Sequence, residues 1–303
     1  MAIAIVVPFV AFLPFVLVVP ALLKLPSAGV YAIGPKLHLG SASDLVEEGE
    51  RYLNSHNLTR AYRSFEQAVK KANDNWRAHL GLARVLSISG RDDEAIMEFI
   101  ESLKLNANNP LARDGLGCLF MKKNSFDEAG GQFKQELDLD PSNLSARGNL
   151  AICMMQMGLI DDCMAQLNAV LKASPTNAEA LYNLGLCESL KARYGEAKAH
   201  LNKVLTIKPG HIATLIALSK CALAQNDASQ AVAYAQRAVA SDPTSQSACI
   251  ALADALDQNG QGERATALYK KAIQMNPRAP VCRLIIDKLI NRQIATSNST
   301  STR

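Results

Sequence analysis

The chain has 303 residues, of which 49% are hydrophobic and only 5% aromatic, and its formal net charge is +4. This length is enough for one large domain or two ordinary ones. Abundant Ala and Leu with few aromatic residues favour helices over sheets. The small net charge gives no support for the concentrated basic face that binds nucleic acid, so we expect no nucleic-acid partner.

The N-terminal segment, residues 1–24, is strongly hydrophobic, and no charged residue occurs from Ala2 to Leu23. At helical rise this run spans about 33 Å, and a hydrocarbon core is about 30 Å thick. Pro8, Pro14 and Pro20 would kink such a helix. We interpret the segment as a retained membrane anchor. The alternatives are a cleaved signal peptide, with Val30-Tyr31-Ala32 as cleavage site, and a peripheral segment or misassigned start.

Flanking charge sets the expected orientation of this anchor. Lys24 and Lys36 follow the apolar run, whereas only the α-amino group precedes it. The positive-inside tendency therefore places the rest of the chain in the cytoplasm. If the segment is instead a cleaved signal, the protein is periplasmic or secreted. Residues 25–41 are rich in Pro and Gly and are predicted to be a linker.

A single repeat period runs through the remainder of the chain. Five prolines are each 34 residues apart: Pro141, Pro175, Pro209, Pro243 and Pro277. The same period relates a leucine column beginning at Leu82, a small-residue column beginning at Ala83 and a column of turn formers at Gly90, Asn124, Gly158, Ala192, Asn226 and Gly260. Columns that share one period indicate a tandem repeat.

Each repeat reads as two helices. Leu184, Cys187 and Leu190 follow helical spacing, as do Ala197, Leu201 and Val204. The Gly or Asn between the two stretches supplies the left-handed residue that ends the first helix. Proline stops the second helix. One unit cannot bury its apolar face alone, so neighbouring units must stack.

These residues resemble the tetratricopeptide repeat, whose pattern is matched by Leu116, Gly117, Phe120, Ala129, Phe133 and Pro141. The resemblance implies an all-α fold, a right-handed α-solenoid of about seven tandem helix-turn-helix units over 42–279. The units are 42–75, 76–109, 110–143, 144–177, 178–211, 212–245 and 246–279. Residues 280–294 read as a capping helix and 295–303 as a disordered tail. The first unit departs from the pattern because Glu48 replaces the column leucine.

No catalytic constellation, phosphate-binding loop or metal motif is present in the sequence, so we expect no enzyme activity, cofactor or metal. Seven dispersed cysteines without a Cys-x-x-Cys pair argue against a disulfide framework and favour a reducing compartment. Cys153, Cys187 and Cys221 are each separated by one repeat period. We interpret them as small buried residues, because stacked units are about 10 Å apart, too far for a disulfide.

The resemblance also implies a concave groove, lined by the first helix of each unit, that holds a peptide or protein partner. The residues expected to line it are Arg84, Ile88, Asp114, Met121, Asn149, Ile152, Met155, Tyr182, Asn183, Leu186, Ile216 and Lys220. For each aliphatic residue the alternative is packing between units. Asn149 and Asn183 occupy equivalent positions, which resembles family members whose asparagine ladder bonds a peptide backbone. The alternative, which we favour, is that each is a buried or solvated asparagine.

One subtype of the family is not expected here. Chaperone-binding members clamp a C-terminal carboxylate, and the position of their first Lys falls here on Val46, Leu80, Asp114, Gly148, Tyr182, Ile216 or Ile250. None of these residues is basic. We therefore expect a membrane-tethered scaffold or adaptor that binds another partner. The alternatives are a self-assembling coat subunit on a membrane, hence a homo-oligomer, and a targeting subunit of a separate enzyme.

Overall fold

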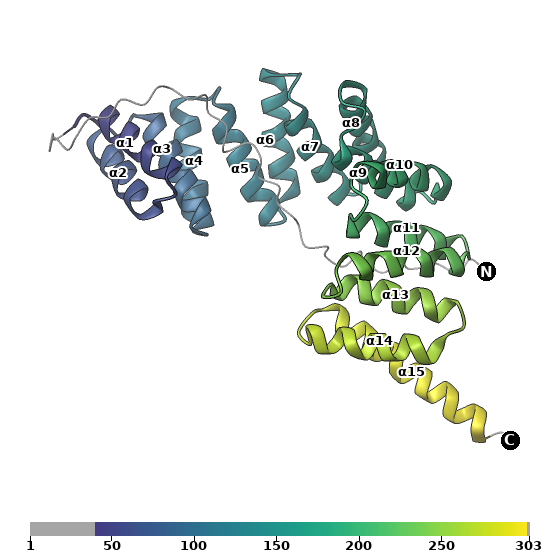
Figure 1. Cartoon of the computed structure of the whole chain (residues 1–303). Helices are drawn as coiled ribbons and strands as arrows, with labels where there is room; N and C mark the ends of the chain where they lie inside the picture. Colours follow the sequence, from purple (N-terminus) through teal and green to yellow (C-terminus); the bar gives the residue numbers. More distant parts are fainter. Residues whose placement is uncertain (1–39, 302–303) are drawn as a thin grey trace. The chain divides into compact units, whose positions relative to one another are not determined.

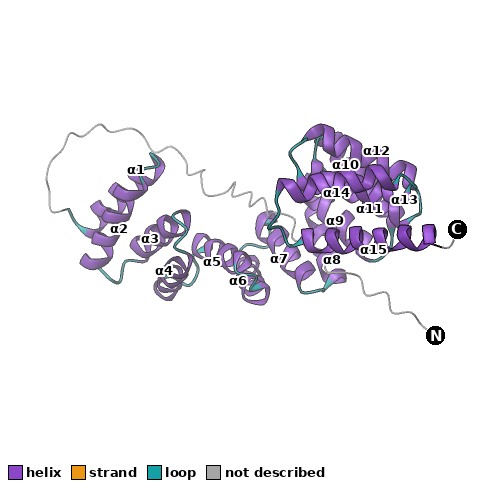
Figure 2. Ribbon diagram, turned by 90° about the horizontal axis from the view of Figure 1, so that it is seen from below, coloured by secondary structure: helices purple, strands orange, loops and turns teal. Residues whose placement is uncertain are grey.

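The computed structural model describes residues 40–301, and within this range every regular element is an α-helix (Figures 1 and 2). The helices are α1 Ala42–Asn54, α2 Leu58–Lys71, α3 Trp76–Ile88, α4 Asp92–Leu105, α5 Pro110–Lys122, α6 Phe126–Leu139, α7 Leu144–Gln156, α8 Ile160–Ala173, α9 Ala178–Leu190, α10 Tyr194–Ile207, α11 Ile212–Ala224, α12 Ala228–Ser241, α13 Gln246–Gln258, α14 Gly262–Met275 and α15 Val281–Ser301. Each predicted unit contains one pair of these helices.

The described chain forms two compact parts, which we call the N-terminal half (residues 40–173, α1–α8) and the C-terminal half (residues 174–301, α9–α15). Within each half the helices pack in chain order. In the N-terminal half α1 packs on α2, α2 on α3, and so on to α8; in the C-terminal half the same order runs from α9 to α15. Stacked helix pairs of this kind confirm the predicted all-α repeat fold.

Side-chain caps start most of the first helices. Asn75, Asn109, Asn143 and Asn177 each precede a helix and accept a hydrogen bond from a backbone N–H of its first turn. Such a cap satisfies one of the donors that a helix start leaves free. His211 occupies the same column without capping the backbone, and its Nδ1 instead contacts Thr214 Oγ1 at 2.7 Å.

The turn column adopts the left-handed conformation that its composition predicted. Gly90, Gly158 and Gly260 have φ between +75° and +78°. The non-glycine members His56, Asn124, Ala192 and Asn226 have φ between +57° and +61°. Asn tolerates this region well, but Ala192 and His56 accept a steric cost there.

Proline is not required for the chain reversal that follows each second helix. The residue after α6, Asp140, precedes Pro141 and has extended backbone angles, which Pro imposes on its predecessor. Ala72 and Asn106, which end α2 and α4, have nearly the same angles without a following proline. The packing of the next unit therefore sets this chain reversal, and proline only stabilises it.

Large residues on the second helices fit between glycines on the first helices. The ring of Phe65 on α2 is fully buried, and a Cβ added to Gly49 on α1 would lie 2.7 Å from it. A Cβ on Gly81, in α3 of the next unit, would lie closer still. Phe65 thus packs into both its own unit and the following one, which is why consecutive units cannot separate without exposing it.

Two features differ from the sequence-based expectation at the ends of the fold. Glu48, in place of the column leucine, accepts a hydrogen bond from Ser64 on α2, which provides a polar contact for it. At the other end, α15 continues to Ser301, so the predicted disordered tail begins as helix. Extending a formed helix gains one hydrogen bond per residue, which offsets the weak propensity of Ser, Thr and Asn.

The predicted membrane anchor lies outside the described residues. Among the helices of residues 40–301, none combines the length and the hydropathy needed to span a bilayer.

Candidate functional site

One column of residues follows the first helices of the units. We call it the ladder; its members, each one repeat period from the next, are Glu50, Arg84, Cys118 and Ile152 in the N-terminal half and Leu186, Lys220, Asp254 and Lys288 in the C-terminal half. The charged members belong to the outer units, and the apolar members belong to the central ones. The resemblance predicted Arg84, Ile152, Leu186 and Lys220 as binding residues.

In the N-terminal half the ladder begins with an ion pair between units. Arg84 Nη1 on α3 donates to Glu50 Oε1 and Oε2 on α1, at 2.8 and 3.0 Å. The Arg84 side chain is only 8% exposed and that of Glu50 is 29% exposed. The resemblance to the repeat family places Arg84 in the partner-binding groove. In the structure, Arg84 pairs with Glu50 and so links the first two units.

In the C-terminal half the last two ladder residues also pair. Lys288 Nζ on α15 donates to Asp254 Oδ1 on α13 at 2.7 Å, and the hydroxyl of Tyr269 on α14 donates to the same oxygen at 2.5 Å. Beside this pair is an open recess of about 510 Å³, lined by Leu223, Asp254, Asp257, Gln258 and Lys288. The recess combines carboxylates, an amide, an ammonium group and one leucine.

The other predicted residues of the N-terminal half differ in accessibility. Met121 and Ile152 are buried in the apolar cluster of α5, α6 and α7. Asp114, Asn149 and Met155 are half-buried, and Ile88 at the end of α3 is 55% exposed. The buried residues Met121 and Ile152 contribute to packing between units. The other four residues remain accessible at the surface.

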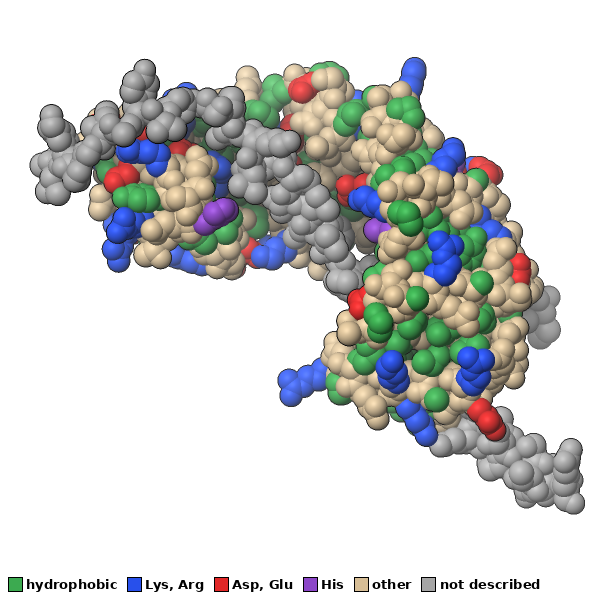
Figure 3. Space-filling view, viewed as in Figure 1, with side chains coloured by type: hydrophobic (Ala, Val, Ile, Leu, Met, Phe, Trp, Pro, Cys, Tyr) green, Lys and Arg blue, Asp and Glu red, His purple; other side chains and the backbone are tan. Residues whose placement is uncertain are grey.

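In the C-terminal half the predicted residues divide in the same way. Asn183 and Ile216 are buried, Tyr182 and Leu186 are half-buried, and Lys220 is exposed. The Tyr182 ring meets His211 edge-on, with centroids 5.6 Å apart, and burial raises the pKa of its phenol to about 12. In the space-filling view, hydrophobic side chains of this half lie between scattered charges (Figure 3).

The most unusual electrostatics occur where α5, α6 and α7 pack together. Burial raises the pKa of the Asp114 carboxyl, whose side chain contacts Cys118 Sγ at 3.9 Å. Burial, and then the negative charge of Asp114, raise the pKa of Glu136 on α6 to about 7. Asn143 Nδ2 donates to Glu136 Oε1 at 2.8 Å, while Glu136 Oε2 is buried without a protein partner.

The seven cysteines lie within residues 40–301, and none of them forms a disulfide there. Burial raises the pKa of Cys118 and of Cys153 to about 12, so both are thiols at neutral pH. Cys153, Cys187 and Cys221 are at most 1% exposed. Their surroundings are those of packed core residues rather than of reactive groups.

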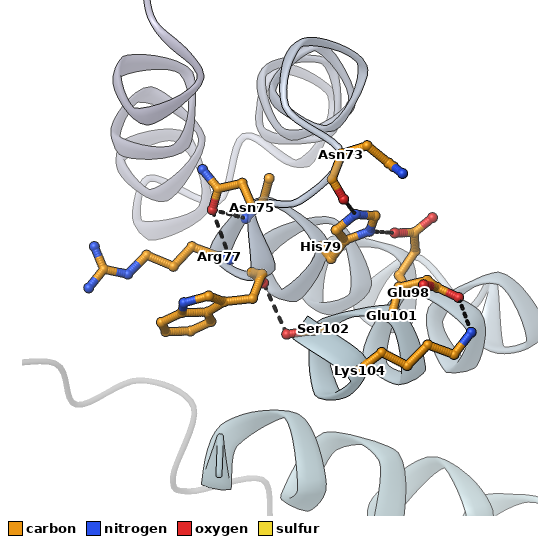
Figure 4. Close-up of polar contacts among 10 residues, drawn as sticks. Asn73, Asn75, Arg77, His79, Glu98, Glu101, Ser102 and Lys104 are labelled. Carbon is orange, nitrogen blue, oxygen red and sulfur yellow. Dashed lines mark hydrogen bonds and ion pairs between the residues drawn. The ribbon is translucent and has the colours of Figure 1, made fainter. Parts of the chain in front are cut away.

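A buried histidine links α3, α4 and the loop that precedes α3 (Figure 4). His79 on α3 is 4% exposed; its Nδ1 contacts Glu98 Oε2 at 2.6 Å and its Nε2 contacts the Asn73 carbonyl at 3.0 Å. Ser102 Oγ donates to the Trp76 carbonyl at 2.9 Å in the same region. This network is structural and does not belong to the predicted groove.

The sequence analysis did not predict the two ion pairs of the ladder, and it did not identify Glu136 as a buried carboxyl. The sequence does contain a signal for the ion pairs, because each joins opposite charges that are one repeat period apart: Glu50 with Arg84, and Asp254 with Lys288. For Glu136 a weaker signal existed: the equivalent positions in the other units hold Ala, Ser or Val.

Comparison with known families and structures agrees with this architecture. Profiles described as tetratricopeptide repeat match residues 46–110, 120–187, 190–243 and 222–285. These matches cover more than half of the chain, which therefore belongs to the tetratricopeptide repeat family. No curated protein matches the sequence.

Solved structures share the fold at low sequence identity. A tetratricopeptide repeat protein from Parabacteroides merdae superposes with a TM-score of 0.69 at 15% identity, over 81% of this chain and 97% of that one. PilW, described as a type IV pilus biogenesis factor, gives 0.60 at 23% identity, over 68% of this chain and 96% of that one. YrrB, described as having an unusual peptide-binding site, gives 0.51 at 18% identity, over 61% and 95%.

Proposed function

We propose that this protein is a non-catalytic adaptor, tethered to a membrane by its N-terminal segment, that binds a protein partner through the first helices of its units. The supporting observation is the set of half-buried or exposed residues along those helices: Ile88, Asp114, Asn149, Met155, Tyr182, Leu186 and Lys220. Apolar and polar groups occur together on these helices, an arrangement that suits peptide recognition by a preformed surface.

The partner-binding surface is tested by affinity capture from native membranes, followed by mass spectrometry. Met155→Glu in the N-terminal half and Leu186→Glu in the C-terminal half each place a charge among half-buried apolar groups. We expect either variant to lose the captured partner while far-UV circular dichroism shows unchanged helicity. Unchanged capture by both would contradict the assigned surface.

Matched controls place the same charge on the second helices. Met97 on α4 is 67% exposed and Ile207 on α10 is 42% exposed. Met97→Glu and Ile207→Glu should capture the partner as well as the parent protein does. If the controls lose it equally, the loss reflects surface charge in general and not this set of residues.

The tether is tested separately, by alkaline carbonate extraction of membranes. The full chain should stay in the membrane pellet, and a chain lacking residues 2–23 should move to the soluble fraction. Release of the full chain by carbonate would contradict a retained anchor. N-terminal sequencing of the membrane-bound protein distinguishes retention from signal cleavage.

Self-assembly is the second candidate function, and one observation favours it. Leu284, Ile286 and Ile290 on α15 are between 44% and 53% exposed. Ile286 continues the column in which Leu82 and Leu116 pack against a second helix, and α15 has no following helix within the described residues. Light scattering over a range of protein concentration measures the molar mass and so tests self-assembly. A strict monomer excludes a coat subunit.

A further inference from the structure

One exposed face of helix α2 is basic. Its residues are Arg60, Arg63, Gln67, Lys70 and Lys71, which recur at helical spacing and therefore lie on one side of α2. All five are exposed, and the buried residues of α2 lie on a different side of the helix. No acidic residue is among them, so the basic face presents cationic groups to its surroundings.

This charge is not a property of the repeat. The same five positions carry more negative than positive charge in the next two second helices: Glu94, Met97, Glu101, Lys104 and Leu105 in α4, and Glu128, Gly131, Gln135, Asp138 and Leu139 in α6. The most basic of the other second helices at these positions is α14, with Arg264 and Lys271. The packing of the units therefore does not require the basic face of α2.

The acidic groups nearby leave this face with a net positive charge. Glu66, at its edge, pairs with Lys70 at 3.0 Å, but water reaches both side chains and screens the pair. Arg63 makes no hydrogen bond or ion pair with any described residue. On the neighbouring helix α1, Glu50 is already paired with Arg84 of the next unit.

The chain enters the fold beside this face. Lys71 Nζ donates to the carbonyl of Gly40, the first described residue, at 2.6 Å. The apolar N-terminal run ends at Leu23, and residues 24–39 can span no more than about 55 Å. These residues include two lysines and no acidic residue. If the apolar run is held in a bilayer, the basic face of α2 is therefore within reach of the lipid headgroups.

From this combination of charge and chain entry we propose that the basic face of α2 docks on the headgroups of an anionic membrane, the same membrane that holds the N-terminal segment. The proposal rests on the tether proposed above. Clusters of about four or more Lys and Arg residues next to a membrane anchor are attracted to anionic lipids without a defined pocket. Tethering raises the effective concentration of lipid at the face, which makes a small cluster sufficient. α2 is a second helix, so this contact does not use the first helices assigned to the partner.

The test compares the full chain in two kinds of nanodisc, one of phosphatidylcholine alone and one of an equimolar mixture with phosphatidylserine. Mass spectrometry measures how fast an uncharged N-hydroxysuccinimide ester acetylates each lysine. Lys70 should react about fivefold more slowly in the anionic nanodiscs, whereas the exposed Lys271 on α14 should react equally fast in both. Added salt should remove the difference, because ions screen the attraction. Equal rates for Lys70 in the two lipids would overturn the proposal.

Variants assign the effect to the basic face. Arg60→Gln/Arg63→Gln keeps Lys70 as the reporter and should abolish its slower reaction in anionic nanodiscs. Arg60→Lys/Arg63→Lys should retain the slower reaction, because docking depends on charge and not on guanidinium geometry. The matched control, Arg264→Gln/Lys270→Gln, removes the same charge from exposed positions of α14 and should also retain it. Equal loss in the control would show attraction by net charge and contradict docking by this face.

Failure of this inference is distinguishable from failure of the tether. If carbonate leaves the full chain in the membrane but Lys70 reacts equally in both lipids, the tether stands and the docking of α2 is wrong. If carbonate releases the full chain, both proposals fail. Thermal melting of Arg60→Gln/Arg63→Gln serves as the folding check. Both positions are exposed, so we expect this variant to melt close to the parent protein.

Discussion

Arg84 and Glu50 occupy equivalent positions in consecutive units and join them by an ion pair in which the arginine is almost completely buried. Removing one partner of such a pair leaves the other buried and uncompensated. Glu50→Ala should therefore lower the free energy of unfolding by about 2–4 kcal/mol, measured by urea denaturation. The double variant Glu50→Leu/Arg84→Leu should recover most of that loss. As a reference, Glu94→Ala breaks the exposed pair with Arg91 and should change the denaturation midpoint far less, because water screens that pair.

Ala192 is the one alanine in the left-handed turn column, with φ of +58°. Glycine adopts this conformation without a clash of Cβ, so Ala192→Gly should stabilise the protein by about 1 kcal/mol. The control is Ala199→Gly, at an exposed position within α10, which should destabilise by about 0.5–1 kcal/mol. Thermal melts of the two variants should shift in opposite directions; a shift of both downward would contradict the assigned backbone conformation.

Two helical glycines should respond oppositely to alanine. Gly81 contacts the Phe65 ring so closely that a Cβ must displace it, and we expect Gly81→Ala to cost about 1–3 kcal/mol. Gly148 faces open space, so Gly148→Ala should gain about 0.5–1 kcal/mol from helix propensity alone. Denaturant midpoints of the two variants measure the difference. Similar effects of both would mean that the packing of Phe65 is not as close as described.

Glu136 makes stability depend on pH near neutrality. Its pKa is raised from 4.5 to about 7, mainly by burial, so the folded state holds a proton that the unfolded state releases. This contribution to stability is complete below about pH 4.5 and is lost as pH rises through about 7. The loss is at most about 3 kcal/mol, because solvent screening reduces the effect of the shifted pKa on stability. Glu136→Gln keeps an acceptor for Asn143 and should flatten the fall in unfolding free energy between pH 5 and pH 8, measured by denaturation at each pH.

The opposite result for Glu136 is equally clear. If the parent and Glu136→Gln show the same pH profile, the carboxyl is ionised throughout and is better hydrated than its burial indicates. Asp140, whose pKa is lowered by hydrogen bonds from Ser142, serves as the comparison. Asp140→Asn should change the profile only at acid pH, because that carboxylate is already charged at pH 5.

Much of the architecture could be predicted from sequence because the repeat period records a local requirement. A left-handed residue must end the first helix, and glycine, asparagine or alanine occupies that place at Gly90, Asn124 and Ala192. Small residues must lie opposite large ones, as Gly117 does opposite Phe133. Both constraints act within or between adjacent helices, so they return once in every unit and are visible in a single sequence.

Only the tertiary structure decided which of the groove residues a partner can reach. Helical periodicity places Arg84, Met121 and Met155 on one side of their helices, but the neighbouring unit buries the first two and leaves the third half-exposed. Burial depends on the exact neighbour across the stack, and a charge such as Glu136 or Asp114 acquires its shifted pKa only from that enclosure. The sequence by itself thus determined the repeat and its turns, because these are short-range. Accessibility and electrostatics arise between helices, and so the packed structure decided them.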